Sequence, residues 1–126
     1  MGVCYLRRTI ASALERRTAM RSKSPLPVIL DVDTGVDDAL AIALACRLPE
    51  FDVIGVTTVA GNVDQQRATE NTRRVLHFLG AGDVPVAPGL TAPLVRPHRD
   101  AMAYHGPNGL GGLELPLSPG RMVGAH

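Results

Sequence analysis

Short apolar runs and longer stretches with helical spacing alternate along most of the chain. Residues 27–33 (PVILDVD) form a β-branched run opened by a proline, which is typical of a buried strand. Residues 52–59 have the same character and predict a second strand, and residues 84–87 predict a short third one. Because Pro85 and Pro88 flank this third run, we expect it to lie near a sheet edge or to end early.

Two helices are predicted between these strands. After the turn at residues 34–36, Asp37 and Asp38 begin a helix that ends before Pro49. Its sequence is apolar on nearly every side, which predicts deep burial. The second helix is predicted over residues 64–79. The positions that recur on one of its faces are Ala68, Thr72, Val75, Leu76 and Leu79.

The order of the elements predicts an α/β fold with an open, mostly parallel sheet and flanking helices. Short connections and right-handed crossovers make three successive strands of this kind parallel. Residues 90–126 are rich in proline and glycine and predict no helix or strand. Because compact domains rarely end in so long an unstructured stretch, we expect residues 27–126 to be the N-terminal part of a domain truncated after about three strands.

Charge is unevenly distributed along the sequence. Residues 1–24 hold six basic groups and one acid, whereas the remainder holds seven basic and eleven acidic groups. We therefore interpret residues 1–26 as a basic, poorly ordered extension, with Met20 as an alternative start. The mildly acidic remainder argues against a nucleic-acid partner.

Composition argues against a membrane protein and against a disulfide-stabilised one. No apolar run is long enough to cross a bilayer. Cys4 and Cys46 form neither a disulfide framework nor a metal-ligand motif. We therefore expect a cytoplasmic protein.

Four aspartates crowd the junction between the first strand and the first helix. Asp31 and Asp33 share one side of a predicted strand, and Asp37 and Asp38 begin the helix after the glycine turn. Two carboxylates about 4 Å apart repel by roughly 4 kcal/mol at an effective dielectric near 20, and a helix N-terminus offsets only about 0.3–1 kcal/mol per anion. No lysine or arginine occurs between positions 25 and 46. A hard divalent cation, Ca²⁺ or Mg²⁺, is therefore favoured over a helix cap beside solvated acids.

Two known acidic sites fit this pattern poorly. An EF-hand loop counted from Asp31 needs glycine and glutamate where Val36 and Ile42 stand. A haloacid-dehalogenase-type phosphatase also opens with a strand ending in Asp-x-Asp. Its hydroxyl residue normally comes two positions after the second acid, where this chain has Gly35, and it has no place for the later aspartate pair.

A third comparison fits. Residues 31–39 (DVDTGVDDA) resemble the signature DTDPGxDDA of the inosine-uridine-preferring nucleoside hydrolase family, with Thr34 where proline is commonest. The resemblance continues at residues 56–62 (VTTVAGN), 88–89 (PG) and 105–111 (HGPNGLG). It covers residues 27–114 in all, and it implies an open α/β fold.

The resemblance also implies a calcium site, because family members hold a tightly bound Ca²⁺. Carried over by motif position, Asp33, Asp37 and Asp38 would be the calcium ligands. Asp33 would be the general base that deprotonates a calcium-bound water, and Asp31 would support the ligands from behind.

The implied activity is calcium-dependent hydrolysis of the N-glycosidic bond of a ribonucleoside. Asp37, Asn62 and His105 would contact the substrate, whose ribose hydroxyls the calcium would also hold. Relatives are more than twice this long and form homo-oligomers, and their remaining calcium ligands lie beyond residue 126. A non-catalytic fragment therefore stays open as an alternative, with the phosphatase less favoured.

Overall fold

The computed structural model describes residues 24–119 and 123–124, so the predicted basic extension lies almost entirely outside the described residues. In chain order the elements are β1 (Leu26–Val32), α2 (Val36–Arg47), β2 (Phe51–Thr58), α3 (Gln65–Phe78), β3 (Val86–Pro88) and α4 (Met102–His105). The strands form one parallel sheet in the order β1-β2-β3. The predicted α/β fold with an open parallel sheet is confirmed.

The pairing of the strands brings their carboxyl ends to one edge of the sheet. β1 pairs with β2 from Leu26–Phe51 to Val32–Thr58, with an irregularity after Val28. β3 pairs with the last three residues of β2 and lies at the outer edge of the described sheet, as its prolines predict. The turns that follow β1 and β2 therefore start side by side.

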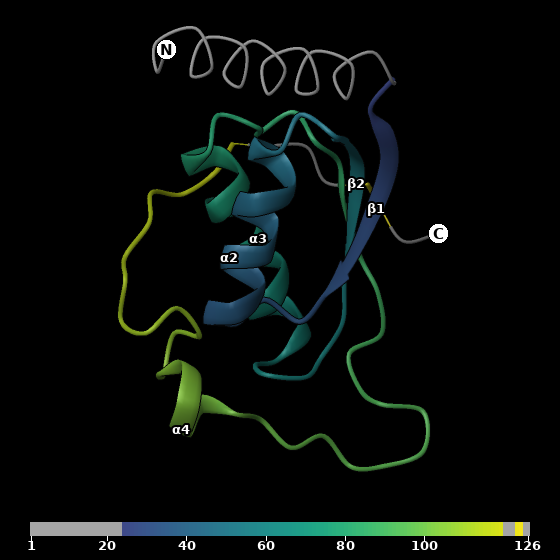
Figure 1. The fold of residues 1–126 in the computed structure, drawn as a ribbon. Coiled ribbons are helices and arrows are strands. Elements are labelled where there is room, and N and C mark those ends of the chain that lie inside the picture. The colour runs from purple at the N-terminus through teal and green to yellow at the C-terminus, as the bar shows by residue number, and fades with distance from the viewer. Residues whose placement is uncertain (1–23, 120–122, 125–126) are drawn as a thin grey trace, which may run out of the picture.

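The hydrophobic core lies between this sheet and the two long helices. Figure 1 shows α2 and α3 together on the same face of the sheet. The buried members of the core are Val32, Ile42, Val56, Val75, Leu76, Val86, Leu110 and Leu115. The face of α3 predicted from helical spacing is the buried one, because Ala68, Thr72, Val75 and Leu76 all lie in the interior.

The prediction that the first helix is deeply buried is wrong for the described chain. Within α2 only Ile42 and Ala45 are buried, whereas Leu40 is 64% exposed and Leu44 is 61% exposed. The helix packs on the sheet and on α3 with one side, whereas the side that carries Leu40 and Leu44 is largely exposed. An apolar sequence around a helix predicts burial only where packing partners surround it.

The segment after β3 is better ordered than its composition predicts. It contains the short helix α4, which lies at the end of the molecule toward which β1 points (Figure 1). The chain then returns along α3, where Leu110 and Leu115 enter the core. In the described ranges, 24–119 and 123–124, no helix has the length and hydropathy of a membrane span.

We predict that truncating the core side chain Leu76 destabilises the fold. Leu76 is 1% exposed, so Leu76→Ala leaves a cavity beneath the sheet and lowers the free energy of unfolding by about 2–5 kcal/mol. The matched control is Phe78→Ala on the same helix, whose side chain is 66% exposed and whose loss changes stability by about 0.5 kcal/mol or less. Urea denaturation followed by circular dichroism measures both, and equal effects would contradict this placement of the core.

Candidate functional site

The β1–α2 turn and the segment after β2 meet at one carboxylate, that of Asp33. Asp33 follows the last residue of β1, and its backbone N–H donates to Oδ2 of Asp38 over 3.1 Å. Its own Oδ2 accepts the backbone N–H of Asn62 over 2.6 Å. Asp33 is thus held between the first turn of α2 and the exit of β2.

Two glycines allow this close approach. An added Cβ on Gly61 would lie 2.7 Å from Cγ of Asp33 and closer still to its Oδ2. A Cβ on Gly35 would lie 2.7 Å from Nδ1 of His105 and 2.9 Å from Nδ2 of Asn62. Neither position has room for a side chain, so both glycines are needed for close approach rather than for an unusual backbone conformation.

Asp37, Asn62 and His105 form the second part of the site. Nδ2 of Asn62 lies 3.5 Å from Oδ1 of Asp37, and Nδ1 of His105 lies 3.8 Å from the same oxygen. The backbone N–H of Val36 donates to Nδ1 of His105 over 3.2 Å, which requires that this nitrogen carry no hydrogen. In this arrangement Nδ1 of His105 is the acceptor, and Nε2 is the ring nitrogen that can donate.

The structure brings three of the four aspartates together and leaves the fourth apart. Asp31 is exposed, and its Oδ1 accepts a 2.6 Å hydrogen bond from the hydroxyl of Thr57 on β2. The side-chain alternation that would align Asp31 with Asp33 applies within a strand, whereas Asp33 lies past the end of β1. The acidic part of the candidate site therefore comprises Asp33, Asp37 and Asp38.

Crowding of these carboxylates perturbs one of them strongly. Burial, a side-chain hydrogen bond to Asp33 and the negative charges of Asp33 and Asp37 raise the pKa of Asp38 to about 6. No lysine or arginine among residues 24–119 and 123–124 forms an ion pair with these three acids. The cluster thus has an excess of negative charge that a cation would relieve.

The three carboxylates fit a calcium ion as part of a ligand set. In the part of the chain that the structure describes, no three His, Cys, Asp or Glu side chains are arranged to hold a metal by themselves. Asp33 and Asp38 each accept a backbone N–H with one oxygen, and a side-chain hydrogen bond joins the two carboxyl groups. Ca²⁺ takes about six to eight oxygen ligands, so these carboxylates have the right donor chemistry but supply only a portion of the shell.

Comparison with known sequences identifies the family. A sequence model described as inosine-uridine preferring nucleoside hydrolase matches residues 28–124. The chain belongs to this family. The matched range includes the aspartate turn (residues 33–38), Asn62 and the His105 loop (residues 105–113). Every member of the candidate site therefore lies inside it.

Similar nucleoside hydrolases occur in bacteria and plants. The non-specific ribonucleoside hydrolase RihC of Klebsiella pneumoniae subsp. pneumoniae is 53% identical over 90 residues, which make up 71% of this chain and 29% of that protein. RihC of Escherichia coli K12 is 48% identical over the same number of residues, again 71% of this chain and 29% of that protein.

Solved structures of nucleoside hydrolases also match this chain. A plant nucleoside hydrolase, PpNRh1, matches with a TM-score of 0.70 and 44% identity over 75% of this chain and 30% of that one. A purine-preferring ribonucleoside hydrolase from Gardnerella vaginalis matches with a TM-score of 0.73 and 36% identity over 78% of this chain and 32% of that one. The chain therefore spans about 30% of the length of the nucleoside hydrolases it matches.

Several residues that hold this site in place were not identified from the sequence. The ring of His98 donates from Nε2 to the carbonyl oxygen of Gly61 over 2.8 Å, and Gly61 lies against the carboxylate of Asp33. Asn71 and Thr72 of α3 bond to Thr34 in the aspartate turn. The signal available in the sequence was the presence of polar residues on the buried face of an amphipathic helix, where each needs a partner.

We predict that Asp38→Asn stabilises the calcium-free chain in a pH-dependent way. The pKa of this carboxyl is about 6 in the folded chain and 3.8 in the reference state, so its ionisation weakens the fold as pH rises through that window. After allowance for solvent screening, the gain is of the order of 1 kcal/mol at pH 8, and it disappears below about pH 4. The asparagine still accepts the N–H of Asp33.

Urea denaturation in EGTA at pH 8 and at pH 3.5 measures this difference. Asp52→Asn is the control, because this exposed aspartate on β2 lies outside the cluster. Stabilisation of the same size at both pH values would argue against charge crowding as its cause.

We also predict that Gly61→Ala displaces the carboxylate of Asp33. The added methyl group overlaps this carboxylate, so the hydrogen bond from the N–H of Asn62 breaks and the fold loses about 1–3 kcal/mol. The amide resonance of Asn62 in an NMR spectrum reports the loss. The control is Gly124→Ala, where an added Cβ meets nothing within 4 Å. An unchanged Asn62 resonance in Gly61→Ala would contradict the prediction.

Proposed function

We propose that this chain carries the proton-accepting residue and part of the calcium site of a ribonucleoside hydrolase. The observation that supports this most directly is the convergence of Asp33, Asp37 and Asp38 at the carboxyl edge of the sheet without a paired lysine or arginine among the described residues. Asn62 and His105 border the same cluster. Family membership supports the same activity.

Asp33, Asp37 and Asp38 are the residues that would hold calcium. All three offer carboxylate oxygens, the donors that Ca²⁺ prefers, and their mutual repulsion is relieved by a divalent cation. When bound, the ion supplies positive charge that makes water easier to deprotonate and that attracts the hydroxyls of a ribose. Asp31, bonded to Thr57, is a supporting residue in this proposal.

The proposed reaction is hydrolysis at C1′ of the ribose. The oxygen of water forms a bond to C1′ while the N-glycosidic bond breaks, and the electron pair of that bond leaves with the nucleobase. Asp33 accepts a proton from the attacking water, and the departing base takes up a proton in turn. Positive charge develops on the sugar in this step, and the neighbouring carboxylates stabilise it.

Asp37, Asn62 and His105 are proposed to contact the nucleoside. Asp37 has a side chain that is 70% exposed, so its oxygens are accessible to sugar hydroxyls. His105 uses Nδ1 for the backbone of Val36, which leaves its Nε2–H to donate to a substrate. Because one similar enzyme is described as non-specific and another as purine-preferring, the proposal is limited to ribonucleosides as a class. The absence of a disulfide pattern favours a cytoplasmic setting for this activity.

We predict that the chain binds calcium weakly through its aspartates. A partial ligand set gives a dissociation constant of about 10⁻⁴–10⁻³ M, and Asp33→Asn weakens binding by about tenfold or more. Isothermal titration of the 126-residue chain with CaCl₂ measures both. Asp52→Asn is the matched control, because this exposed aspartate on β2 lies outside the cluster and its loss changes the dissociation constant by about twofold or less. Equal weakening by the two substitutions would argue against a site centred on Asp33.

The activity itself is tested in a chimera. The 90 residues that match RihC of Klebsiella pneumoniae replace their counterparts in that enzyme, so that the rest of the pocket is present. We expect calcium-dependent release of hypoxanthine from inosine, and we expect Asp33→Asn to lower kcat by about 10²-fold or more, the range in which proton transfer contributes. A folded chimera that binds calcium but releases no base would favour the non-catalytic alternative.

A further inference from the structure

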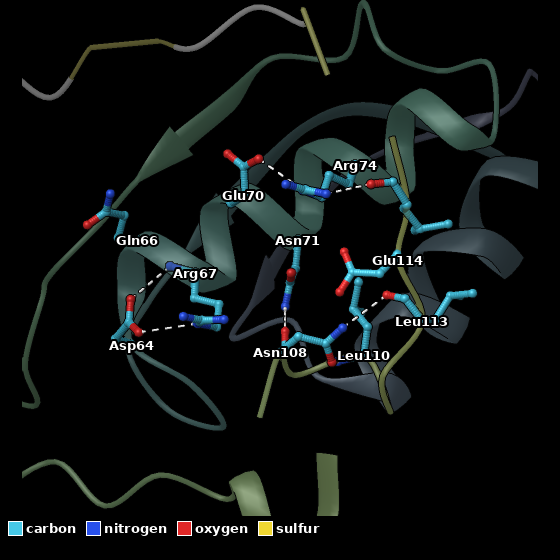
Figure 2. A pocket seen from close by; sticks show the side chains of 11 residues that line it. Asp64, Gln66, Arg67, Glu70, Asn71, Arg74, Asn108, Leu110, Leu113 and Glu114 are labelled. Carbon is cyan, nitrogen blue, oxygen red and sulfur yellow. Dashed lines mark hydrogen bonds and ion pairs between the residues drawn. The ribbon is translucent and has the colours of Figure 1, made fainter. Parts of the chain in front are cut away.

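Helix α3 carries a buried amide that bonds to two loops at once. Asn71 is 5% exposed, and its Nδ2 donates over 3.2 Å to the carbonyl oxygen of Thr34 and over 2.9 Å to that of Asn108. Figure 2 shows its side chain directed toward Asn108, on the wall of a cavity of about 440 Å³ beside α3. The two carbonyls are far apart in sequence and belong to the two loops of the candidate site.

Each of these loops carries residues of that site. Thr34 follows Asp33 and precedes Gly35, so its carbonyl belongs to the aspartate turn. Asn108 lies three residues after His105, in the loop that leaves α4. A direct bond between the loops runs from the N–H of Val36 to the ring of His105. Asn71 adds a buried link behind it.

The loop after His105 is held together by hydrogen bonds among its own residues. The side-chain oxygen of Asn108 accepts the N–H groups of Leu110 and Gly112, each over 3.0 Å, and its Nδ2 donates to the carbonyl of Leu113. The N–H of Gly111 donates to the carbonyl of His105 over 2.7 Å. Fixing the carbonyl of Asn108 therefore also restrains the backbone of His105, from which its ring extends toward Val36.

An asparagine suits this position for chemical reasons. Its Nδ2 has two hydrogens, one for each carbonyl, whereas a hydroxyl offers one hydrogen and a carboxylate offers none. The loop approaches the amide closely, because an added Cβ on Gly109 would lie 2.8 Å from Nδ2 of Asn71. Gly109 also has φ +79°, a conformation that side chains rarely adopt.

We propose that Asn71 is a positioning residue, which holds the His105 loop in a fixed position relative to the aspartate turn. The importance of this relative position for function rests on the proposed nucleoside hydrolase activity. The turn has a separate support in the hydroxyl contact between Thr34 and Thr72 at 2.6 Å, and Asp33 is held by Asp38 and Asn62. Loss of Asn71 therefore releases the His105 loop and leaves the aspartates in place.

Two variants, Asn71→Ala and Asn71→Asp, test this in the 126-residue chain without metal or substrate. Hydrogen exchange followed by NMR should show that the amides of Gly109 and Gly111 exchange about tenfold faster, whereas those of the aspartate turn change by about twofold or less. The amide proton of Val36 should shift upfield and the ring ¹⁵N signals of His105 should change, because the bond between them is weakened.

Three control variants separate positioning from a general loss of stability. Gln66→Ala changes an exposed residue of α3 that lines the same cavity, and it should leave the loop unaffected. Val75→Ala weakens the core beneath the sheet, and it should raise exchange in both loops by similar factors. Thr72→Val removes the hydroxyl contact with Thr34, and it should loosen the aspartate turn more than the His105 loop.

Unchanged exchange and an unchanged Val36 resonance in both Asn71 variants would overturn the proposal. Parallel loosening of both loops, as expected for Val75→Ala, would overturn it as well. Since the measurement involves neither calcium nor nucleoside, its outcome is independent of the chimera assay. An inactive chimera would therefore count against the proposed function, and an unaltered loop would count against the role of Asn71.

Discussion

The site depends on the hydrogen bond between the carboxylate of Asp33 and the backbone N–H of Asn62. This bond joins the ends of two neighbouring strands, and it holds one anion within reach of two others. Holding like charges together costs free energy, which is visible in the raised pKa of Asp38. This unfavourable free energy arises at the sheet edge where parallel α/β folds bind ligands. The carboxylate of Asp33 can approach Asn62 and Asp38 this closely because Gly35 and Gly61 have no side chains.

Helix α3 stabilises this arrangement from beneath. Its buried hydroxyls contact the turn after β1 and the end of β2: Thr72 contacts Thr34 over 2.6 Å, and Thr69 contacts Thr58 over 2.7 Å. Asn71, on the same helix, reaches a third segment. These contacts are polar and therefore directional, so they specify the relative position of the loops in a way that an apolar surface would not. The helix thus contributes both to the core and to the geometry of the acids.

Much of the fold and of the candidate site could be predicted from local features of the sequence. The strands and helices follow apolar periodicity, and the aspartate turn follows from a strand, a glycine and a helix start in succession. The separation of Asp31 from Asp33 was not predictable, because the chain leaves the strand between them. The exposure of Leu40 and Leu44 was not predictable either, because burial depends on what surrounds a helix. The partners of Asn71 are two loops distant in sequence, and no local pattern indicates such a pairing.

The exposed aliphatic side chains of the fold have a consequence for its tendency to associate with other proteins. Besides the leucines of α2, Ile29 and Ile54 lie exposed on the strands, at 64% and 50%. Surfaces of this kind attract chaperones and promote self-association, and the quality-control machinery removes chains that keep them open. Covering these aliphatic faces with further protein therefore lowers the tendency of the fold to self-associate.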